Sequence, residues 1–161
     1  MSNNNRSSRT ITYGGIIAAL YIILTAISNA FGLASGMIQL RLSEALCILP
    51  CFFPEAIFGI AIGCLISNVL TGAMLWDVVF GTLATLIGAL GTYKLRANRW
   101  LAALPPIIAN TLIIPPVLAY GYGVEKGLWV LMLTVGAGEF ISVFVLGELL
   151  YSGINKRKLF H

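Results

Sequence analysis

Long apolar stretches recur along the whole sequence and constrain its fold more than any other feature. Runs of 18 or more predominantly apolar residues are each long enough to cross a bilayer as an α-helix. Only 10% of the 161 residues are charged, whereas a typical soluble domain has about 25%. The sequence therefore predicts an all-α membrane protein with a single domain, whose functional groups lie inside the helix bundle or against a partner.

Basic residues lie at the ends of the apolar runs, and their placement indicates the orientation of the chain. They form three clusters: Arg6 with Arg9, the segment 94–99, and the segment 156–158. The positive-inside rule puts such clusters on the cytoplasmic side of a membrane. Both termini are then cytoplasmic, which requires an even number of crossings. Because this rule accounts for the net charge of +4, nucleic-acid binding is not expected.

Six transmembrane helices satisfy this requirement if the segment before Pro54 is counted as a short helix of its own. Five helices would put the C-terminal basic cluster outside. The expected helices cover residues 11–32, 40–53, 55–70, 75–93, 100–120 and 126–152. The expected organisation is a disordered cytoplasmic N-terminus at 1–9, a six-helix transmembrane domain at 10–155 and a basic cytoplasmic tail at 156–161.

The stretch 37–77 carries more polar groups than a membrane hairpin requires. An ionisable side chain at the centre of a bilayer costs roughly 2.5–3.5 kcal/mol on insertion scales, so such groups indicate a binding site or internal pairing. In the predicted topology, five residues of the stretch lie toward the outer face: Arg41, Glu44, Asn68, Trp76 and Asp77. The alternatives are an intrahelical ion pair for Arg41 and Glu44, and an interfacial anchor for Trp76 and Asp77.

Two further polar residues, Asn110 and Glu139, are expected near the middle of the membrane. A carboxylate at that depth must find a partner, take up a proton or face a cavity. Glu139 therefore either contacts a ligand or pairs internally with Arg41. Asn110 either contacts the same ligand or joins two helices by a hydrogen bond. The other carboxylates of the apolar segments, Glu55 and Glu148, fall toward the cytoplasmic side and are not included in the predicted site.

Small residues in the first helix are spaced so that another helix can approach closely. Gly14 and Ala18 are four residues apart, and so are Gly15 and Ala19. This spacing places small side chains on one helix face. The two pairs either pack within the bundle or form a docking face for another membrane subunit.

The sequence contains no catalytic motif. It has no Walker A sequence, no HExxH and no Gly-x-Ser-x-Gly, so an enzyme is not expected and ATP hydrolysis would require other subunits. The three cysteines, Cys47, Cys51 and Cys64, lie in apolar surroundings without a nearby histidine. They are expected to pack in the core rather than bind a metal, and no cofactor is expected in this chain.

Two segments carry a resemblance to a known family: IQLRLSEALCILPCFFPEAIFGIAIGCLISNVL at 38–70 and WDVVFGTLATLIGALGTYKLR at 76–96. With these segments the sequence resembles the QueT family, the substrate-binding S components of energy-coupling factor (ECF) transporters. The resemblance implies a six-helix bundle in the bacterial cell membrane, surrounded by lipid. It also implies binding to a transmembrane coupling subunit and to two cytoplasmic ATPase subunits, with the small residues of the first helix as the docking face.

The resemblance further implies uptake of queuosine precursors, which are 7-deazaguanines such as preQ1, preQ0 or queuine. A carboxylate can bridge the adjacent N1–H and NH₂ donors of a deazaguanine, and Glu139 is the first candidate for that role. Asn110 or Asn68 would contact the carbonyl and ring nitrogens, and Trp76 or a tyrosine such as Tyr120 or Tyr122 would stack on the ring. The aminomethyl cation of preQ1 would pair with Asp77 or Glu44.

Two other functions stay open at this point. The chain could be a small proton-coupled transporter of a flat vitamin-like or nucleobase-like solute, acting as an oligomer with Glu139 as the proton site. It could also be an assembly subunit that binds no ligand.

Overall fold

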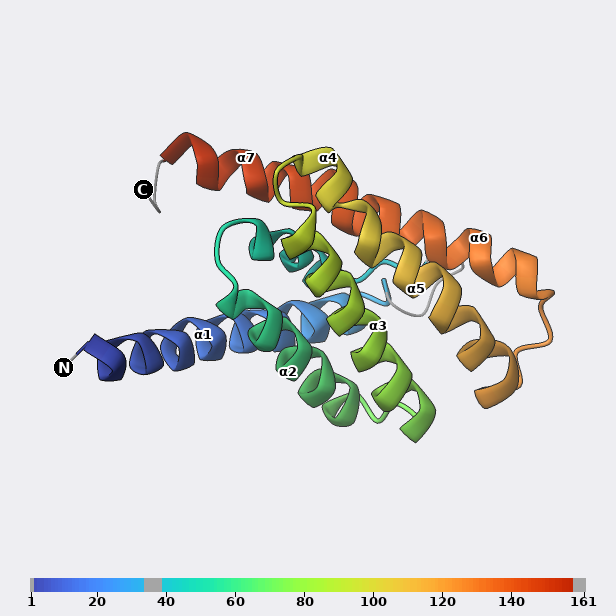
Figure 1. Ribbon diagram of the computed structural model, residues 1–161. Coiled ribbons are helices and arrows are strands. Elements are labelled where there is room, and N and C mark those ends of the chain that lie inside the picture. The colour runs from blue at the N-terminus through green and yellow to red at the C-terminus, as the bar shows by residue number, and fades with distance from the viewer. Residues whose placement is uncertain (1, 34–38, 158–161) are drawn as a thin grey trace.

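The computed structural model describes residues 2–33 and 39–157, and this part of the chain is helical throughout apart from its connecting loops (Figure 1). Six helical segments follow one another, as the sequence predicts. The first four are α1 (Ser2–Ala30), the short 3₁₀ helix η1 (Leu42–Cys51), α2 (Glu55–Leu70) and α3 (Leu75–Lys94). The fifth consists of α4 (Arg99–Ala102), α5 (Leu104–Pro116) and the π-helical turn η2 (Val117–Gly121), and the sixth of α6 (Leu128–Glu139), the π-helical η3 (Phe140–Leu146) and α7 (Gly147–Arg157).

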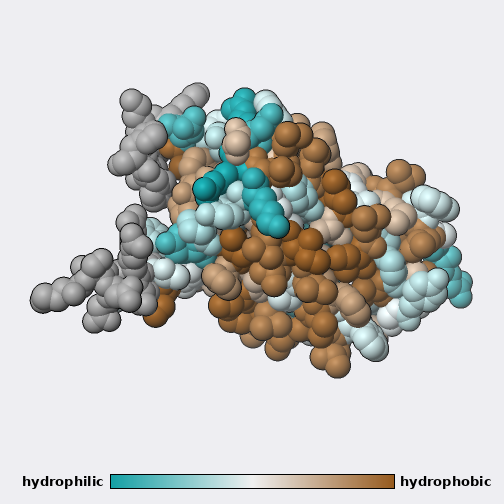
Figure 2. Space-filling view, in the orientation of Figure 1, coloured by the Kyte–Doolittle hydropathy of each residue, from teal (hydrophilic) through white to brown (hydrophobic). Residues whose placement is uncertain are grey.

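Four of the six segments are long and apolar enough to cross a membrane. They cover Thr10–Ala30, Leu75–Lys94, Arg99–Gly121 and Leu128–Asn155. A broad band of apolar side chains covers the middle of the visible face, and hydrophilic side chains gather toward its two ends (Figure 2). The chain is therefore a multi-pass membrane protein. Both the start of α1 and the end of α7 lie on the left of Figure 1, so the two helix ends share one side of the bundle.

The second and third segments are shorter than a complete span. As a 3₁₀ helix of 10 residues, η1 extends over about 20 Å at a rise of about 2.0 Å per residue, whereas the hydrocarbon core is about 30 Å thick. The eight residues from Ser43 to Pro50 are all buried, and η1 packs against α1, α3, η3 and α7. It is the central element of the bundle, and its apolar sequence reflects contact with other helices.

The first helix is longer than the sequence predicts. α1 starts at Ser2 rather than at about residue 11, so residues 2–9, for which the sequence predicts disorder, are helical. This polar segment contains neither Pro nor Gly, so nothing in it interrupts the helix that continues from the apolar stretch. The hydroxyl of Thr12 also donates to the carbonyl oxygen of Ser8 at 2.8 Å. The last residues of the predicted C-terminal tail, 158–161, lie outside the described residues.

Small residues bring α1 and α2 into close contact. A Cβ atom added to Gly63 of α2 would lie 2.7 Å from the Cβ of Tyr21 and 3.0 Å from the carbonyl oxygen of Ala18. A Cβ atom on Gly59 would lie 2.7 Å from the carbonyl oxygen of Gly14. The pair Gly14 and Ala18 therefore packs inside the bundle, against α2, which is the first of the two predicted roles for these residues.

The second small pair of α1 has a different environment. Gly15 and Ala19 are exposed, and a Cβ atom on Gly15 would meet nothing within 4 Å. They lie among exposed apolar side chains of the same helix, which are Ile16, Leu20, Ile23 and Ile27. Within the described residues this outer face of α1 is uncovered.

Tight turns end α1 and α2 at the same end of the bundle. Gly72 adopts a φ of 71°, a left-handed conformation that glycine accepts at little cost. Its amide donates to the carbonyl of Val69, and the amide of Ala73 donates to that of Asn68, which is the Schellman pattern. Gly32 ends α1 in the same way. These turns bring the ends of α1 and α2 and the start of α3 around one cavity.

Candidate functional site

A polar cavity of about 820 Å³ opens at this end of the bundle. Its volume falls within the range of about 300–1,000 Å³ that is usual for small-molecule sites. The lining comes from α1, the end of α2, the start of α3 and the turn between them, the extended segment before η1, and η2 with the loop after it. Its polar side chains are Thr25, Asn29, Gln39, Arg41, Asn68, Thr71, Asp77 and Tyr122. We call this space the outer cavity.

Asp77 lies at the centre of the polar contacts in the outer cavity. Its Oδ2 atom is 3.8 Å from Nη2 of Arg41 and accepts a hydrogen bond from the hydroxyl of Tyr122 at 3.3 Å. Asn68 donates from Nδ2 to the backbone oxygen of Asp77 at 3.4 Å. The Oδ1 atom of Asp77 is buried and has no partner among the described residues. The carboxylate can therefore accept one further hydrogen bond from a ligand.

Tyr122 connects two loops of the site. Its hydroxyl accepts a hydrogen bond from the amide of Met74 at 3.0 Å while donating to Asp77. Burial raises the pKa of Tyr122 above its ordinary value, and the nearby Asp77 carboxylate acts in the same direction. The phenol therefore stays protonated at neutral pH and remains a donor to Asp77.

A second, much smaller space lies beneath Gln39 and Arg41, which line both cavities. We call it the inner chamber. Its remaining lining consists of Glu44, Asn110, Ile114, Val135 and Glu139. Its volume of about 10 Å³ is enough for about one water molecule. A ring-shaped ligand can enter it only if the segment that carries Gln39 and Arg41 moves.

The inner chamber contains an unpaired acceptor and an unpaired donor. The Oε2 atom of Glu139 and the Nδ2 atom of Asn110 are both buried and have no hydrogen-bond partner among the described residues. An unpaired buried polar group costs about 1–3 kcal/mol, so native proteins rarely contain such groups without a reason. A ligand that both donates and accepts hydrogen bonds would satisfy both residues.

The carboxylate of Glu44 accepts hydrogen bonds from two neutral side chains. The hydroxyl of Tyr21 on α1 donates to Oε1 of Glu44, and the thiol of Cys47 donates to Oε2 at 3.1 Å. Glu44 is 2% exposed. The intrahelical ion pair between Arg41 and Glu44, one of the predicted alternatives, does not form within the described residues, because Arg41 pairs with Asp77 instead.

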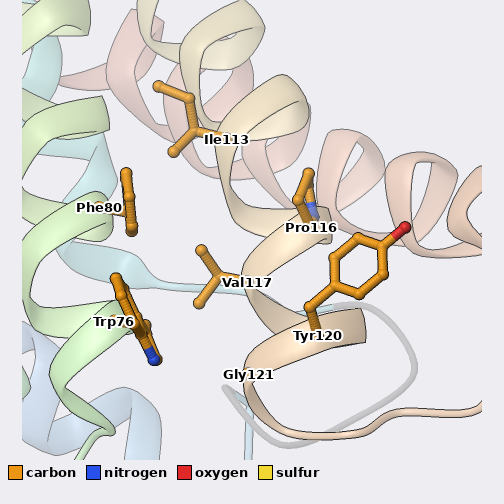
Figure 3. A pocket seen from close by; sticks show the side chains of 7 residues that line it. All are labelled: Trp76, Phe80, Ile113, Pro116, Val117, Tyr120 and Gly121. Atoms are coloured by element: carbon orange, nitrogen blue, oxygen red, sulfur yellow. The ribbon is translucent and has the colours of Figure 1, made fainter.

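Trp76 lies outside both polar cavities. It is 58% exposed and stacks on Phe80, with the two ring centroids 5.9 Å apart. Figure 3 shows these two rings of α3 facing Ile113 and Val117 across an apolar groove of about 560 Å³. The groove is larger than the inner chamber but lacks the charged and amide groups that would orient a polar ligand. In this structure Trp76 is therefore not placed to stack on a ligand of the polar site.

A separate ion pair lies at the opposite end of the bundle. Nε of Arg99 is 3.6 Å from Oε2 of Glu148, and the guanidinium of Arg99 also lies 4.4 Å from the centroid of the Trp100 ring. Glu55 begins α2, and neither Glu55 nor Glu148 lines the polar cavities. The structure thus keeps both residues away from the candidate site, as the sequence predicts.

The structure brings together six of the seven predicted site residues. Arg41, Glu44, Asn110 and Glu139 line the inner chamber, and Arg41, Asn68 and Asp77 line the outer cavity. Several residues of the site are not among the seven predicted ones, and three of them matter most: Gln39 lines both cavities, Tyr21 donates to Glu44, and Tyr122 donates to Asp77. The spacing of Tyr21, Thr25 and Ser28 on one face of α1 is a signal that could have revealed the second of them.

The chain matches a family whose description is QueT transporter, over residues 11–156. A protein of Lactococcus lactis subsp. cremoris (strain MG1363), named queuosine precursor transporter QueT, is 42% identical over 72 residues. These residues are 45% of this chain and 42% of the relative, so the match spans less than half the length of either. No solved structure matches the chain. The family match covers nearly the whole sequence and confirms the resemblance, so the chain belongs to the QueT transporter family.

Proposed function

We propose that this protein is the substrate-binding subunit of an ECF-type importer in the bacterial cell membrane and that it takes up queuosine precursors. The family is one of transporters rather than enzymes, and the relative from Lactococcus lactis carries the name of a queuosine precursor transporter. In this proposal both termini are cytoplasmic, and the outer cavity opens to the outside of the cell.

The substrate assignment is supported by two neighbouring atoms without a hydrogen-bond partner among the described residues, Oε2 of Glu139 and Nδ2 of Asn110. A 7-deazaguanine has adjacent N1–H and exocyclic NH₂ donors, and a carboxylate accepts two hydrogen bonds side by side. The carbonyl oxygen and ring nitrogens of the base provide acceptors for the amide NH₂ of Asn110. One ligand edge can thus satisfy both residues.

Binding then requires the inner chamber to enlarge. Gln39 and Arg41 separate it from the outer cavity, and Arg41 is fixed by its contact with Asp77 at 3.8 Å. We propose that the precursor first occupies the outer cavity and then displaces this segment to reach Glu139. The outer cavity of about 820 Å³ also leaves space for a substituent on the base, such as the cyclopentene diol of queuine.

Titration calorimetry on the purified chain in detergent tests the substrate class. PreQ1, preQ0 and queuine are the ligands, with guanine and riboflavin as comparisons. We expect at least one deazaguanine to bind much more tightly than guanine or riboflavin. If no deazapurine bound to the folded protein, the substrate assignment would be wrong.

The proposed partners are a transmembrane coupling subunit and two cytoplasmic ATPases, which hydrolyse the ATP. The outer face of α1 supports this part, because Gly15 and Ala19 lie exposed among apolar side chains. Ala19→Trp should abolish co-purification with the coupling module and leave ligand binding unchanged. Leu133→Trp is the matched control, since Leu133 is 74% exposed on α6, and it should leave the complex intact. Complex formation by Ala19→Trp would exclude this face.

A proton-coupled transporter, acting as an oligomer, is the second candidate function. It is favoured by the same unpaired oxygen of Glu139, which a proton would also satisfy. Uptake measurements separate the two mechanisms. Uptake by an ECF importer depends on the ATPase subunits and persists when the proton gradient is dissipated, whereas proton-coupled uptake needs only this chain and the gradient.

A further inference from the structure

Glu44 has a buried carboxylate without a cationic partner. Both of its oxygens accept hydrogen bonds from neutral groups, the hydroxyl of Tyr21 and the thiol of Cys47. Among the side chains that the structure describes, the ion pairs join Arg41 to Asp77 and Arg99 to Glu148, and none of these side chains brings a Lys or Arg nitrogen within 4 Å of the Glu44 oxygens. A buried charge is costly unless it is paired.

Three polar residues on one face of α1 hold the beginning of η1 in place. Tyr21, Thr25 and Ser28 are four and three residues apart, so they share a helix face. Tyr21 donates to Glu44, and the hydroxyl groups of Thr25 and Ser43 are hydrogen-bonded to each other at 2.9 Å. Ser28 accepts from the amide of Leu42, also at 2.9 Å. Each of the first three residues of η1 is therefore bonded to α1, and the Glu44 side chain is fixed where it lines the inner chamber.

The inner chamber contains more acidic than basic groups. Glu44 and Glu139 line it together with a single cationic residue, Arg41, and the guanidinium of Arg41 already pairs with Asp77. Hydrogen bonds from an ionised donor to a carboxylate are about twice as strong as those between neutral groups. A ligand that brings a positive charge would therefore gain more from this chamber than a neutral ligand of the same shape.

We propose that Glu44 selects substrates that carry a positive charge and that Tyr21 is the positioning residue that orients its carboxylate. The inference rests on the proposed function and goes beyond it, because it names the charge of the substrate that the site prefers and adds a residue of α1 to the site. Tyr21 itself is 1% exposed and acts through Glu44 rather than on the ligand.

The test compares two deazaguanines that differ mainly in charge. The 7-aminomethyl compound is a cation at neutral pH and the 7-cyano compound is neutral. Calorimetry gives the ratio of their affinities for the wild type and for Tyr21→Phe, Glu44→Gln and the double variant. We expect the wild type to prefer the cation by about tenfold or more. Glu44→Gln should bring the ratio to about one, and Tyr21→Phe should lower it several-fold.

The double variant distinguishes a positioning role from a merely structural one. If Tyr21 acts through Glu44, adding Tyr21→Phe to Glu44→Gln should not change the ratio further, because the two effects are coupled. A further, additive fall would show that Tyr21 acts independently and would overturn its positioning role. Tyr120→Phe is the matched control, since Tyr120 is 85% exposed and removal of its hydroxyl should leave both affinities unchanged.

Glu44→Asp provides a second test if Tyr21→Phe fails to fold. It keeps the charge but draws the carboxylate back by one methylene, so the preference for the cation should fall although the charge remains. An unchanged ratio would refute the need for a positioned carboxylate.

Equal affinity of the wild type for the two compounds would overturn the charge selection and leave the proposed function standing. Failure of the wild type to bind either compound would refute the proposed function, and this inference with it.

Discussion

Glu139 has the surroundings that a ligand-binding carboxylate requires. It is 6% exposed, its Oε2 atom is unpaired among the described residues, and it shares the inner chamber with the equally unpaired Nδ2 atom of Asn110. The two unpaired groups therefore indicate a site prepared for a ligand edge that both donates and accepts.

Glu139→Gln should weaken deazaguanine binding by about tenfold or more. The amide keeps the size of the side chain but replaces a charged acceptor with a neutral one, and it turns one acceptor into a donor. Calorimetry measures the affinity, and a thermal melt in detergent verifies that the variant is folded. Glu125→Gln is the matched control, because Glu125 is exposed in the loop before α6. Unchanged affinity of Glu139→Gln would remove this residue from the site.

The sequence predicts the ionisable residues of the site better than their hydroxyl partners. Arg41, Asp77 and Glu139 stand out because charged groups are rare and costly within apolar segments. Tyr21 and Tyr122 do not stand out, because a tyrosine in an apolar helix or at its end is equally typical of a core or of a membrane interface. The direction in which Trp76 points is also not predictable, since α3 is apolar on several faces and its rotation is set by its neighbours.

At the scale of helices, the contact between α1 and α2 depends on Gly63. A Cβ atom at this position would lie 2.7 Å from the Cβ of Tyr21 and 3.1 Å from the Cα of Ala18, and neither atom can move without shifting α1. Tyr21 and Thr25 on that helix bond to η1. A change in the distance between α1 and α2 would therefore also shift the position of the Glu44 side chain.

Gly63→Ala should destabilise the protein by about 1–3 kcal/mol, because the added methyl group forces the two helices apart. Gly15→Ala is the matched control: its Cβ would meet nothing within 4 Å, and alanine in a helix is favoured over glycine by up to about 1 kcal/mol. The midpoint of thermal unfolding in detergent should fall for the first variant and be unchanged or higher for the second. An equal midpoint for Gly63→Ala and the wild type would contradict the close packing of α1 on α2.

The number and order of the helices follow from the sequence, but the environment of η1 does not. Apolar runs and basic clusters are sufficient to predict six segments and most of their ends, but not the start of α1 at Ser2. A short apolar run looks the same whether it faces lipid or other helices, so the sequence does not show that η1 lies in the centre of the bundle. Its burial results from contacts with α1, which precedes it, and with α3, η3 and α7, of which η3 and α7 lie about 90 residues or more further along the chain.

At the scale of the whole molecule, the two polar cavities and the Arg99–Glu148 pair lie at opposite ends of the bundle. The outer cavity is formed where α1 and α2 end and α3 begins, and the ion pair joins α4 to α7. In the proposed orientation the cavity faces outward and the basic loop 94–99 faces the cytoplasm, as the positive-inside rule requires. A substrate-binding subunit that loads from outside needs this arrangement, because the reverse orientation would open the cavity to the cytoplasm.

Single cysteines test this orientation in intact bacterial cells. Glu125→Cys places a thiol in the loop before α6, and Ala97→Cys places one in the exposed loop between α3 and α4 without removing a basic residue. A membrane-impermeant maleimide should label position 125 in intact cells and position 97 only after permeabilisation. The wild type gives the background, because Cys47 and Cys64 are 0% exposed and Cys51 is partly buried. Labelling of position 97 but not of position 125 in intact cells would reverse the orientation. The outer cavity would then open to the cytoplasm, and the protein could not load its substrate from outside through that cavity.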